Sequence, residues 1–139
     1  NDLPLKLKNK ISNLNAIHKW QSRRNVSEVA KLTKEQEQET PPVKHPLIRT
    51  HPISKEKSVY INPNRIDHIS GLNENESDEL LDELYEFSFQ SKYQYSHSYQ
   101  KGDLVIWDNR CTMHKANSDY DTSQLRIMHR VMLEGEAVF

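Results

Sequence analysis

The stretch Trp-Asp-Asn-Arg-Cys-Thr-Met-His at residues 107–114 joins the end of an apolar segment to a polar corner and a histidine. Residues 104–107 are apolar and follow the turn residues 101–103, so they are predicted to form a strand. The polar corner at 108–110 then ends this strand. His114 therefore stands where a side chain can project from a strand end into a pocket, which none of the other six histidines does as clearly.

Two arginines follow on a second predicted strand, over residues 125–133. Side chains alternate along a strand, so Arg126 and Arg130 point to the same side. Guanidinium groups on a largely apolar strand are costly unless they are paired with anions, and their planar fork suits a carboxylate or a sulfonate. The pattern predicts an anion site beside the imidazole. The equally weighted alternative is a set of internal ion pairs, with partners at Asp108, Asp119 or Glu134.

The composition excludes several classes of protein. The chain has 139 residues, the size of one domain, and its net charge of −1 argues against a nucleic-acid surface. It holds no run of about 18 apolar residues, so no membrane span is expected. A single cysteine and the absence of a basic-then-apolar leader predict a reducing, cytoplasmic location. Only 35% of the residues are hydrophobic, and the chain opens at Asn1, so a piece of a longer polypeptide is expected.

The remaining elements are predicted from periodicity and from start and stop signals. They are helices over 3–20 and 74–90, strands over 47–50, 59–61 and 93–99, and a polar, mobile loop over 31–44. The helix over 74–90 is the clearest, because Asn73 and Glu76 have the spacing of a capping box. Antiparallel strands with a covering helix predict a mostly β (α+β) fold. The visible strands are too few to close a barrel.

Four separated blocks resemble the taurine/2,4-D dioxygenase (TauD/TfdA) family, which consists of Fe(II)- and 2-oxoglutarate-dependent oxygenases. The resemblance begins with W-D-N-R-C-T-M-H and R-I-M-H-R at 107–114 and 126–130. It extends back through H-P-L-I-R-T-H-P at 45–52, Y-I-N-P at 60–63 and G-L-N-E-N-E-S-D-E-L-L at 71–81. The blocks keep the family's order and cover roughly 45–137. Such agreement is very improbable by chance.

The resemblance implies a double-stranded β-helix (jelly roll) in which two histidines and one carboxylate hold iron. By motif, His114 matches the distal histidine ligand, and Arg126 matches the arginine that pairs with the far carboxylate of 2-oxoglutarate. Arg130 matches an arginine that meets the anionic group of the substrate. The implied reaction uses O₂ and hydroxylates a small organic anion, namely a sulfonate, a sulfate ester or an aryloxyalkanoate. Succinate and CO₂ are the co-products.

The family's other two ligands come from a His-x-Asp or His-x-Glu motif, which no histidine of this chain provides. The motif is expected upstream of Asn1, so the chain alone should be inactive. Residues 1–45 are then an insert, helix plus Pro-rich loop, and residues 46–139 form the C-terminal half of the oxygenase domain. The alternative is a non-catalytic binding or structural module on a degenerate jelly-roll scaffold. A homo-oligomer is compatible with the family, but no patch indicates one.

Overall fold

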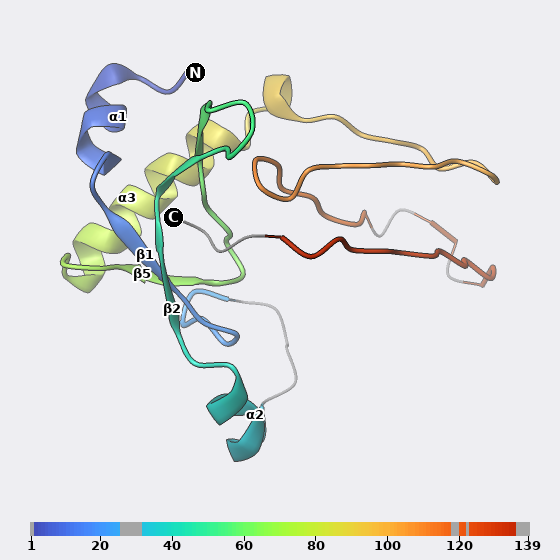
Figure 1. The fold of residues 1–139 in the computed structure, drawn as a ribbon, viewed down its shortest axis with the longest axis horizontal. Helices are drawn as coiled ribbons and strands as arrows, with labels where there is room; N and C mark the ends of the chain where they lie inside the picture. Colours follow the sequence, from blue (N-terminus) through green and yellow to red (C-terminus); the bar gives the residue numbers. More distant parts are fainter. Residues whose placement is uncertain (1, 26–31, 118–119, 122, 136–139) are drawn as a thin grey trace.

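Two small antiparallel sheets and the helices beside them contain most of the regular secondary structure of the described residues (Figure 1). The computed structural model describes residues 2–25, 32–117, 120–121 and 123–135. Its elements are α1 (Leu5–Ile11), β1 (Asn15–His18), α2 (Lys34–Glu39), β2 (Val43–Pro46), β3 (Ile48–Thr50), β4 (Lys57–Val59), β5 (Ile66–Ile69), α3 (Glu74–Ser88) and the 3-10 turn η1 (Ser91–Tyr93).

The larger sheet has the order β2-β1-β5, with β1 antiparallel to both neighbours. Strands β3 and β4 form a separate hairpin, with Ile48 opposite Val59. Leu47 connects the two sheets through its main chain. Its N–H donates to the Leu14 carbonyl at 2.9 Å, and its own carbonyl accepts from the Tyr60 N–H at 2.8 Å. The hairpin is thereby held in place beside the three-stranded sheet.

The core lies between α3 and the three-stranded sheet. Leu80, Leu81 and Leu84 form one face of α3 and are completely buried. Ile66 and Ile69 of β5 are also completely buried and belong to the same cluster. The helix predicted over 74–90 is therefore confirmed as α3, and so is its start. The Asn73 side chain accepts from the Glu76 N–H, and the Glu76 side chain accepts from the Asn73 N–H.

A buried serine joins α3 to the end of β5. Ser77 is completely buried, and its hydroxyl oxygen accepts from the Ile69 N–H at 2.8 Å. We expect Ser77→Ala to lower the free energy of unfolding by about 1–3 kcal/mol, because the Ile69 N–H loses its partner inside the core. Glu79→Ala on the exposed side of α3 should change it by no more than about 0.5 kcal/mol. Urea unfolding of the full-length protein measures both, and equal effects would contradict the role of Ser77.

The helix predicted over 3–20 is wrong in its second half. Helix α1 ends at Ile11, and Asn15–His18 form β1, the central strand of the larger sheet. The apolar residues keep a helical spacing through this region, but strand pairing on both sides overrides that local preference. Leu7 and Ile11 are buried as the helical pattern predicts.

The loop predicted over 31–44 is also wrong in most of the part that the structure describes; residue 31 lies outside that part. Lys34–Glu39 form α2, which begins with a capping box between Thr33 and Gln36. Val43–Pro46 then form β2, whose hydrogen bonds come from β1. The division of the chain at residue 45 stays a prediction.

Strand β5 was not predicted, because Asp67 and His68 interrupt its apolar residues. Asp67 is only 5% exposed. It is stabilised there by the Arg23 N–H at 3.0 Å and the Lys19 ammonium at 3.2 Å. These partners come from a distant part of the chain. A buried carboxylate supported in this way has no local signal.

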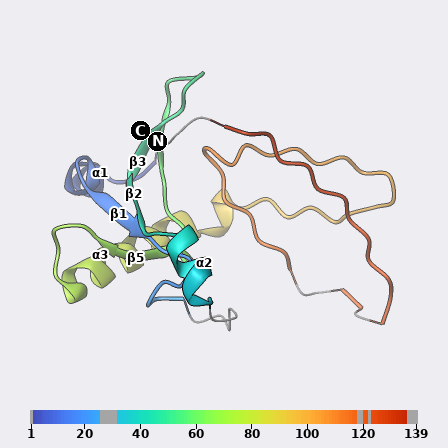
Figure 2. The same ribbon diagram turned by 60° about the horizontal axis from the view of Figure 1, so that its bottom comes forward.

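The chain beyond α3 leaves the sheets as long extended arms (Figures 1 and 2). The turn at 101–103 is confirmed, with Gly102 at φ +95°. The strands predicted over 93–99, 104–107 and 125–133 are not found among the described residues. Beyond α3, the only regular element among those residues is η1. A strand needs a hydrogen-bonded neighbour, and the described residues offer these arms none.

The strand predicted over 47–50 is confirmed as β3, whereas the one predicted over 59–61 starts and ends earlier, as β4. A fold of sheets with few covering helices, the α+β class, is therefore confirmed. No helix among the described residues has both the length and the apolar character required to cross a bilayer.

Candidate functional site

His114 ends the 107–114 stretch, in an extended arm, and its side chain is exposed. Its imidazole packs against the indole of Trp107, with ring centroids 4.8 Å apart. The indole N–H in turn donates to the Asn109 side chain at 2.9 Å. Within the described part of the chain, the two ring nitrogens of His114 make no hydrogen bond. An imidazole with an available nitrogen suits Fe(II), so the donor group fits the predicted role.

The two predicted anion-binding arginines lie on the last described segment and are exposed. The Arg126 guanidinium sits over the Tyr120 ring, 5.0 Å from its centroid. Among the described residues neither Arg126 nor Arg130 forms an ion pair. The alternative of internal pairing is therefore not seen with Asp108 or Glu134, and Asp119 lies outside the described residues. Among the described residues, neither guanidinium has an anionic partner.

No contact joins His114 to Arg126 in the described part of the structure, and both side chains face solvent. The expected convergence of this imidazole and this guanidinium on one pocket is thus not displayed here, and it stays a prediction. The roles of His114, Arg126 and Arg130 likewise rest on their motifs.

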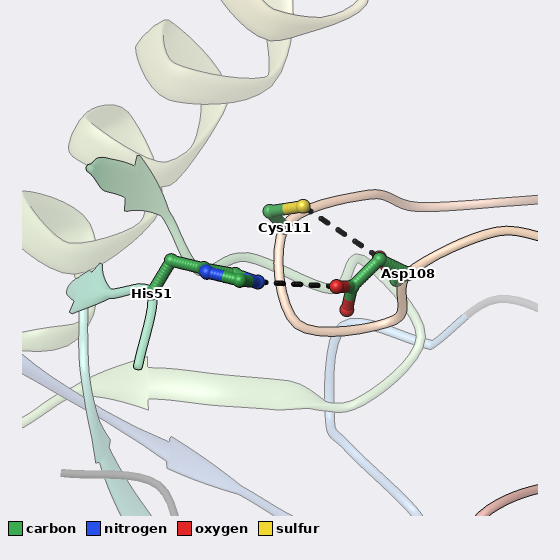
Figure 3. A group of neighbouring side chains, drawn as sticks. All are labelled: His51, Asp108 and Cys111. Carbon is green, nitrogen blue, oxygen red and sulfur yellow. Dashed lines mark hydrogen bonds and ion pairs between the residues drawn. The ribbon is translucent and has the colours of Figure 1, made fainter. Parts of the chain in front are cut away.

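The structure does assemble one group that sequence reasoning missed: His51, Asp108 and Cys111 (Figure 3). His51 follows β3, and its Nε2 lies 3.1 Å from Oδ2 of Asp108. Nothing in the sequence around His51 indicates a role for it. The polar corner after residue 107 was visible in the sequence, but its partner lies 57 residues away. No local pattern predicts a pair so distant.

Donor atoms of these three residues lie within 4.8 Å of one another, close enough to surround a cation. The arrangement nevertheless does not suit a metal. The Arg110 side chain donates to both carboxylate oxygens of Asp108, at 2.8 and 3.0 Å, and would repel a cation. The other His51 nitrogen, Nδ1, already accepts from the Ser54 N–H at 3.1 Å. These hydrogen bonds instead link two segments of the protein.

Arg110 also sets the charge of Asp108. Hydrogen bonds from the Arg110 side chain, then from its main chain, and a further one from His51 hold the pKa of Asp108 far below its ordinary value. Asp108 is therefore a carboxylate at any physiological pH.

A second group, formed by His18, His45 and Tyr60, lies where β1, β2 and the end of β4 meet. The His18 and His45 rings are 4.9 Å apart, edge to face, and the Tyr60 ring packs on both. Burial, reinforced by His45, lowers the pKa of His18 to about 4. Burial also lowers the pKa of His45, and the Arg49 guanidinium adds to that effect. Both rings are therefore neutral in the folded protein near pH 7.

We expect this pair to make the fold sensitive to acid. A histidine whose pKa is lowered by folding contributes its full stability above the unfolded pKa of 6.5, and this is lost as the pH falls toward about 4. For a partly exposed His18 the loss is about 1–2 kcal/mol. His18→Phe should flatten the dependence of the unfolding free energy on pH over that range, whereas His129→Phe at an exposed site should not. An unchanged slope in His18→Phe would contradict this origin.

Comparisons with known proteins connect the motifs to one family. Residues 1–132 match the model of the "Taurine catabolism dioxygenase TauD, TfdA family". The alpha-ketoglutarate-dependent 2,4-dichlorophenoxyacetate dioxygenase of Burkholderia sp. (strain RASC) is 37% identical over 96% of this chain and 44% of its own length. The (S)-phenoxypropionate/alpha-ketoglutarate-dioxygenase of Sphingobium herbicidovorans is 40% identical over 66% of this chain and 31% of its own length.

A solved structure agrees with these relatives. The crystal structure of AAD-2 in complex with Mn(II) and N-oxalylglycine superposes with a TM-score of 0.78 at 34% identity. The match covers 88% of this chain and 48% of that one. The chain thus spans less than half the length of the first relatives it matches.

Proposed function

The chain belongs to the taurine catabolism dioxygenase TauD, TfdA family, and from that premise we propose that it is part of an Fe(II)- and 2-oxoglutarate-dependent dioxygenase. The protein would hydroxylate a small organic anion and convert 2-oxoglutarate and O₂ to succinate and CO₂. The family match over 1–132 is the observation that carries this proposal. The non-catalytic alternative is not favoured, since the relatives reported above are named as dioxygenases.

His114 is the proposed metal ligand of this chain, and the exposed imidazole with available nitrogens supports that role. The metal, when bound, supplies the activation of O₂. The Trp107 ring packs on the His114 imidazole, and the indole N–H donates to the Asn109 side chain, so the rotation of the imidazole is restricted. The protein's part is therefore to present one nitrogen in a fixed direction.

Arg126 and Arg130 are the proposed anion-binding residues. The Tyr120 ring beneath the Arg126 guanidinium orients its fork and leaves its edge N–H groups available. A guanidinium donates two parallel hydrogen bonds to a carboxylate, so Arg126 would bind and orient the far carboxylate of 2-oxoglutarate. Arg130 follows Arg126 by four residues and would lie on the same side of the proposed strand. It would bind the anionic group of the substrate.

The extended arms are proposed to be strands of the C-terminal half of a double-stranded β-helix. Leu104 and Ile106 are each 84% exposed, and Leu125 and Leu133 are 87% and 94% exposed. Apolar side chains at this exposure favour burial against further strands. The division into residues 1–45 and 46–139 and the cytoplasmic location belong to the same proposal.

The substrate class is proposed from two sources: the second arginine, which suits a carboxylate, sulfonate or sulfate, and the relatives named for 2,4-dichlorophenoxyacetate and phenoxypropionate. Aryloxyalkanoates are accordingly the first class to test, followed by sulfonates and sulfate esters.

The test is succinate release by the full-length protein, measured with and without Fe(II), with and without 2-oxoglutarate, and across those three substrate classes. We expect release to require both Fe(II) and 2-oxoglutarate and to rise with one class of anion. A full-length protein that is folded yet binds neither Fe(II) nor 2-oxoglutarate would favour the non-catalytic module.

A further inference from the structure

The hydrogen bond between His51 and Asp108 joins the β3–β4 hairpin to the turn that precedes His114 (Figure 3). It is well shielded on the histidine side, where only 13% of the His51 side chain is exposed. The bond lies next to the turn at 108–112, which leads to His114.

The hydrogen bonds of His51 fix its tautomer. Nδ1 accepts from the Ser54 N–H at 3.1 Å and from the Ile53 N–H at 3.3 Å, so this nitrogen carries no proton. The ring proton therefore lies on Nε2, which donates to Asp108. The imidazole is oriented by the hairpin before it reaches the carboxylate.

Asp108 in turn organises the residues that follow it. Its main-chain carbonyl accepts from the Thr112 N–H at 3.0 Å and the Thr112 hydroxyl at 2.6 Å. The Cys111 N–H donates to the same carbonyl at 3.3 Å. The turn over 108–112 is thus built on Asp108.

The same turn is connected to His114 in two ways, through the ring that packs on it and through the backbone that leads to it. Trp107, immediately before Asp108, packs its ring on the His114 imidazole. Thr112, at the end of the turn, is two residues before His114 in the chain. A displacement of Asp108 therefore moves the ring that supports the imidazole and the backbone that carries it.

We propose that His51 and Asp108 are positioning residues that set the direction of the His114 imidazole toward the metal. This inference rests on the proposed function of His114 as a ligand. Neither residue touches the metal; each acts through the turn at 108–112.

The variant His51→Leu in the full-length protein tests this role. We expect it to weaken Fe(II) binding about 10- to 100-fold, the usual effect of removing a group that orients a ligand. His51→Gln keeps an N–H donor for Asp108 and should restore most of the affinity. The measurement is the dissociation constant for Fe(II) under anaerobic conditions, with thermal unfolding of the apo protein recorded beside it.

A matched control exists in the same arm. His97 Nε2 lies 3.0 Å from Oδ2 of Asp103, a pair of the same type. Among the described residues, no hydrogen bond or ion pair joins it to the turn at 108–112. His97→Leu should leave the Fe(II) dissociation constant unchanged. If His51→Leu does not fold, Asp108→Asn decides, because it keeps the size of the side chain and removes its charge; Fe(II) binding is expected to weaken in the same direction.

The outcomes separate this inference from the proposed function. Loss of Fe(II) affinity in His51→Leu with recovery in His51→Gln supports the positioning role. Wild-type Fe(II) affinity in His51→Leu, or equal losses in His51→Leu and His97→Leu, overturns the positioning role. If the wild-type protein still binds Fe(II) in that case, the proposed function of His114 is unaffected. A folded wild-type protein that binds no Fe(II) overturns both.

Discussion

The full-length protein carrying His114→Ala is expected to lose succinate release that depends on Fe(II) and 2-oxoglutarate. The imidazole is the one proposed ligand that this chain contributes. Removing a ligand directly should cost more than removing a group that only orients one, so Fe(II) affinity is expected to fall by more than about 100-fold. Anaerobic titration with Fe(II), followed by a succinate assay, measures both effects.

The matched control for this prediction is His129→Ala. His129 is also exposed on a C-terminal arm, and along a strand it would point away from the side that carries Arg126 and Arg130. It should retain wild-type Fe(II) affinity and turnover. If His114→Ala kept both properties, or if the two variants lost them equally, the assignment of His114 as ligand would be wrong.

Arg126→Ala is expected to raise the KM for 2-oxoglutarate, because it removes a charged, two-point hydrogen bond to the far carboxylate. Such a loss costs about 1.5–3 kcal/mol, which corresponds to about a 10- to 150-fold change in KM. Arg126→Lys keeps the charge but not the planar fork, so its KM for 2-oxoglutarate should lie between those of the wild type and Arg126→Ala. Initial rates over a range of 2-oxoglutarate concentrations give these values.

Arg130→Ala should show the opposite selectivity, with a higher KM for the organic anion and a nearly unchanged KM for 2-oxoglutarate. The two arginines share a strand and a chemical type, so general damage to the arm would affect both constants in both variants. A rise in the same constant in both variants would refute the separate roles.

The sequence predicts α3 well because its signals are local. Asn73 and Glu76 are three residues apart, and the leucines of the stripe recur within two turns, so the helix is specified by neighbours along the chain. The position of β3 is also indicated locally, by Leu47 and Ile48 between Pro46 and Pro52.

The missed elements depend on partners that are distant in the chain. Residues 15–18 could continue a helix, but β2 and β5 pair with them on both sides. The arms at 104–107 and 125–133 are rich in apolar residues, as strands are, yet no described neighbour completes a ladder for them. Pattern alone specifies that a segment can be a strand, and pairing decides whether it is one.

The candidate site divides in the same way. His114, Arg126 and Arg130 are proposed from their motifs, which are local in the sequence and lie in order along the chain. The bond between His51 and Asp108 was missed, since it spans 57 residues and uses a histidine with no motif of its own that indicated a role.

The central claim is that one 2-oxoglutarate molecule is held by a metal at His114 and by the Arg126 guanidinium. The most direct measurement is the dissociation constant of 2-oxoglutarate for the full-length protein, without O₂, in the presence and absence of Fe(II). Fe(II) is predicted to tighten binding to the wild type but not to His114→Ala, and Arg126→Ala is predicted to weaken it about tenfold or more. Binding of 2-oxoglutarate that is the same with and without Fe(II), and in all three proteins, would contradict the account.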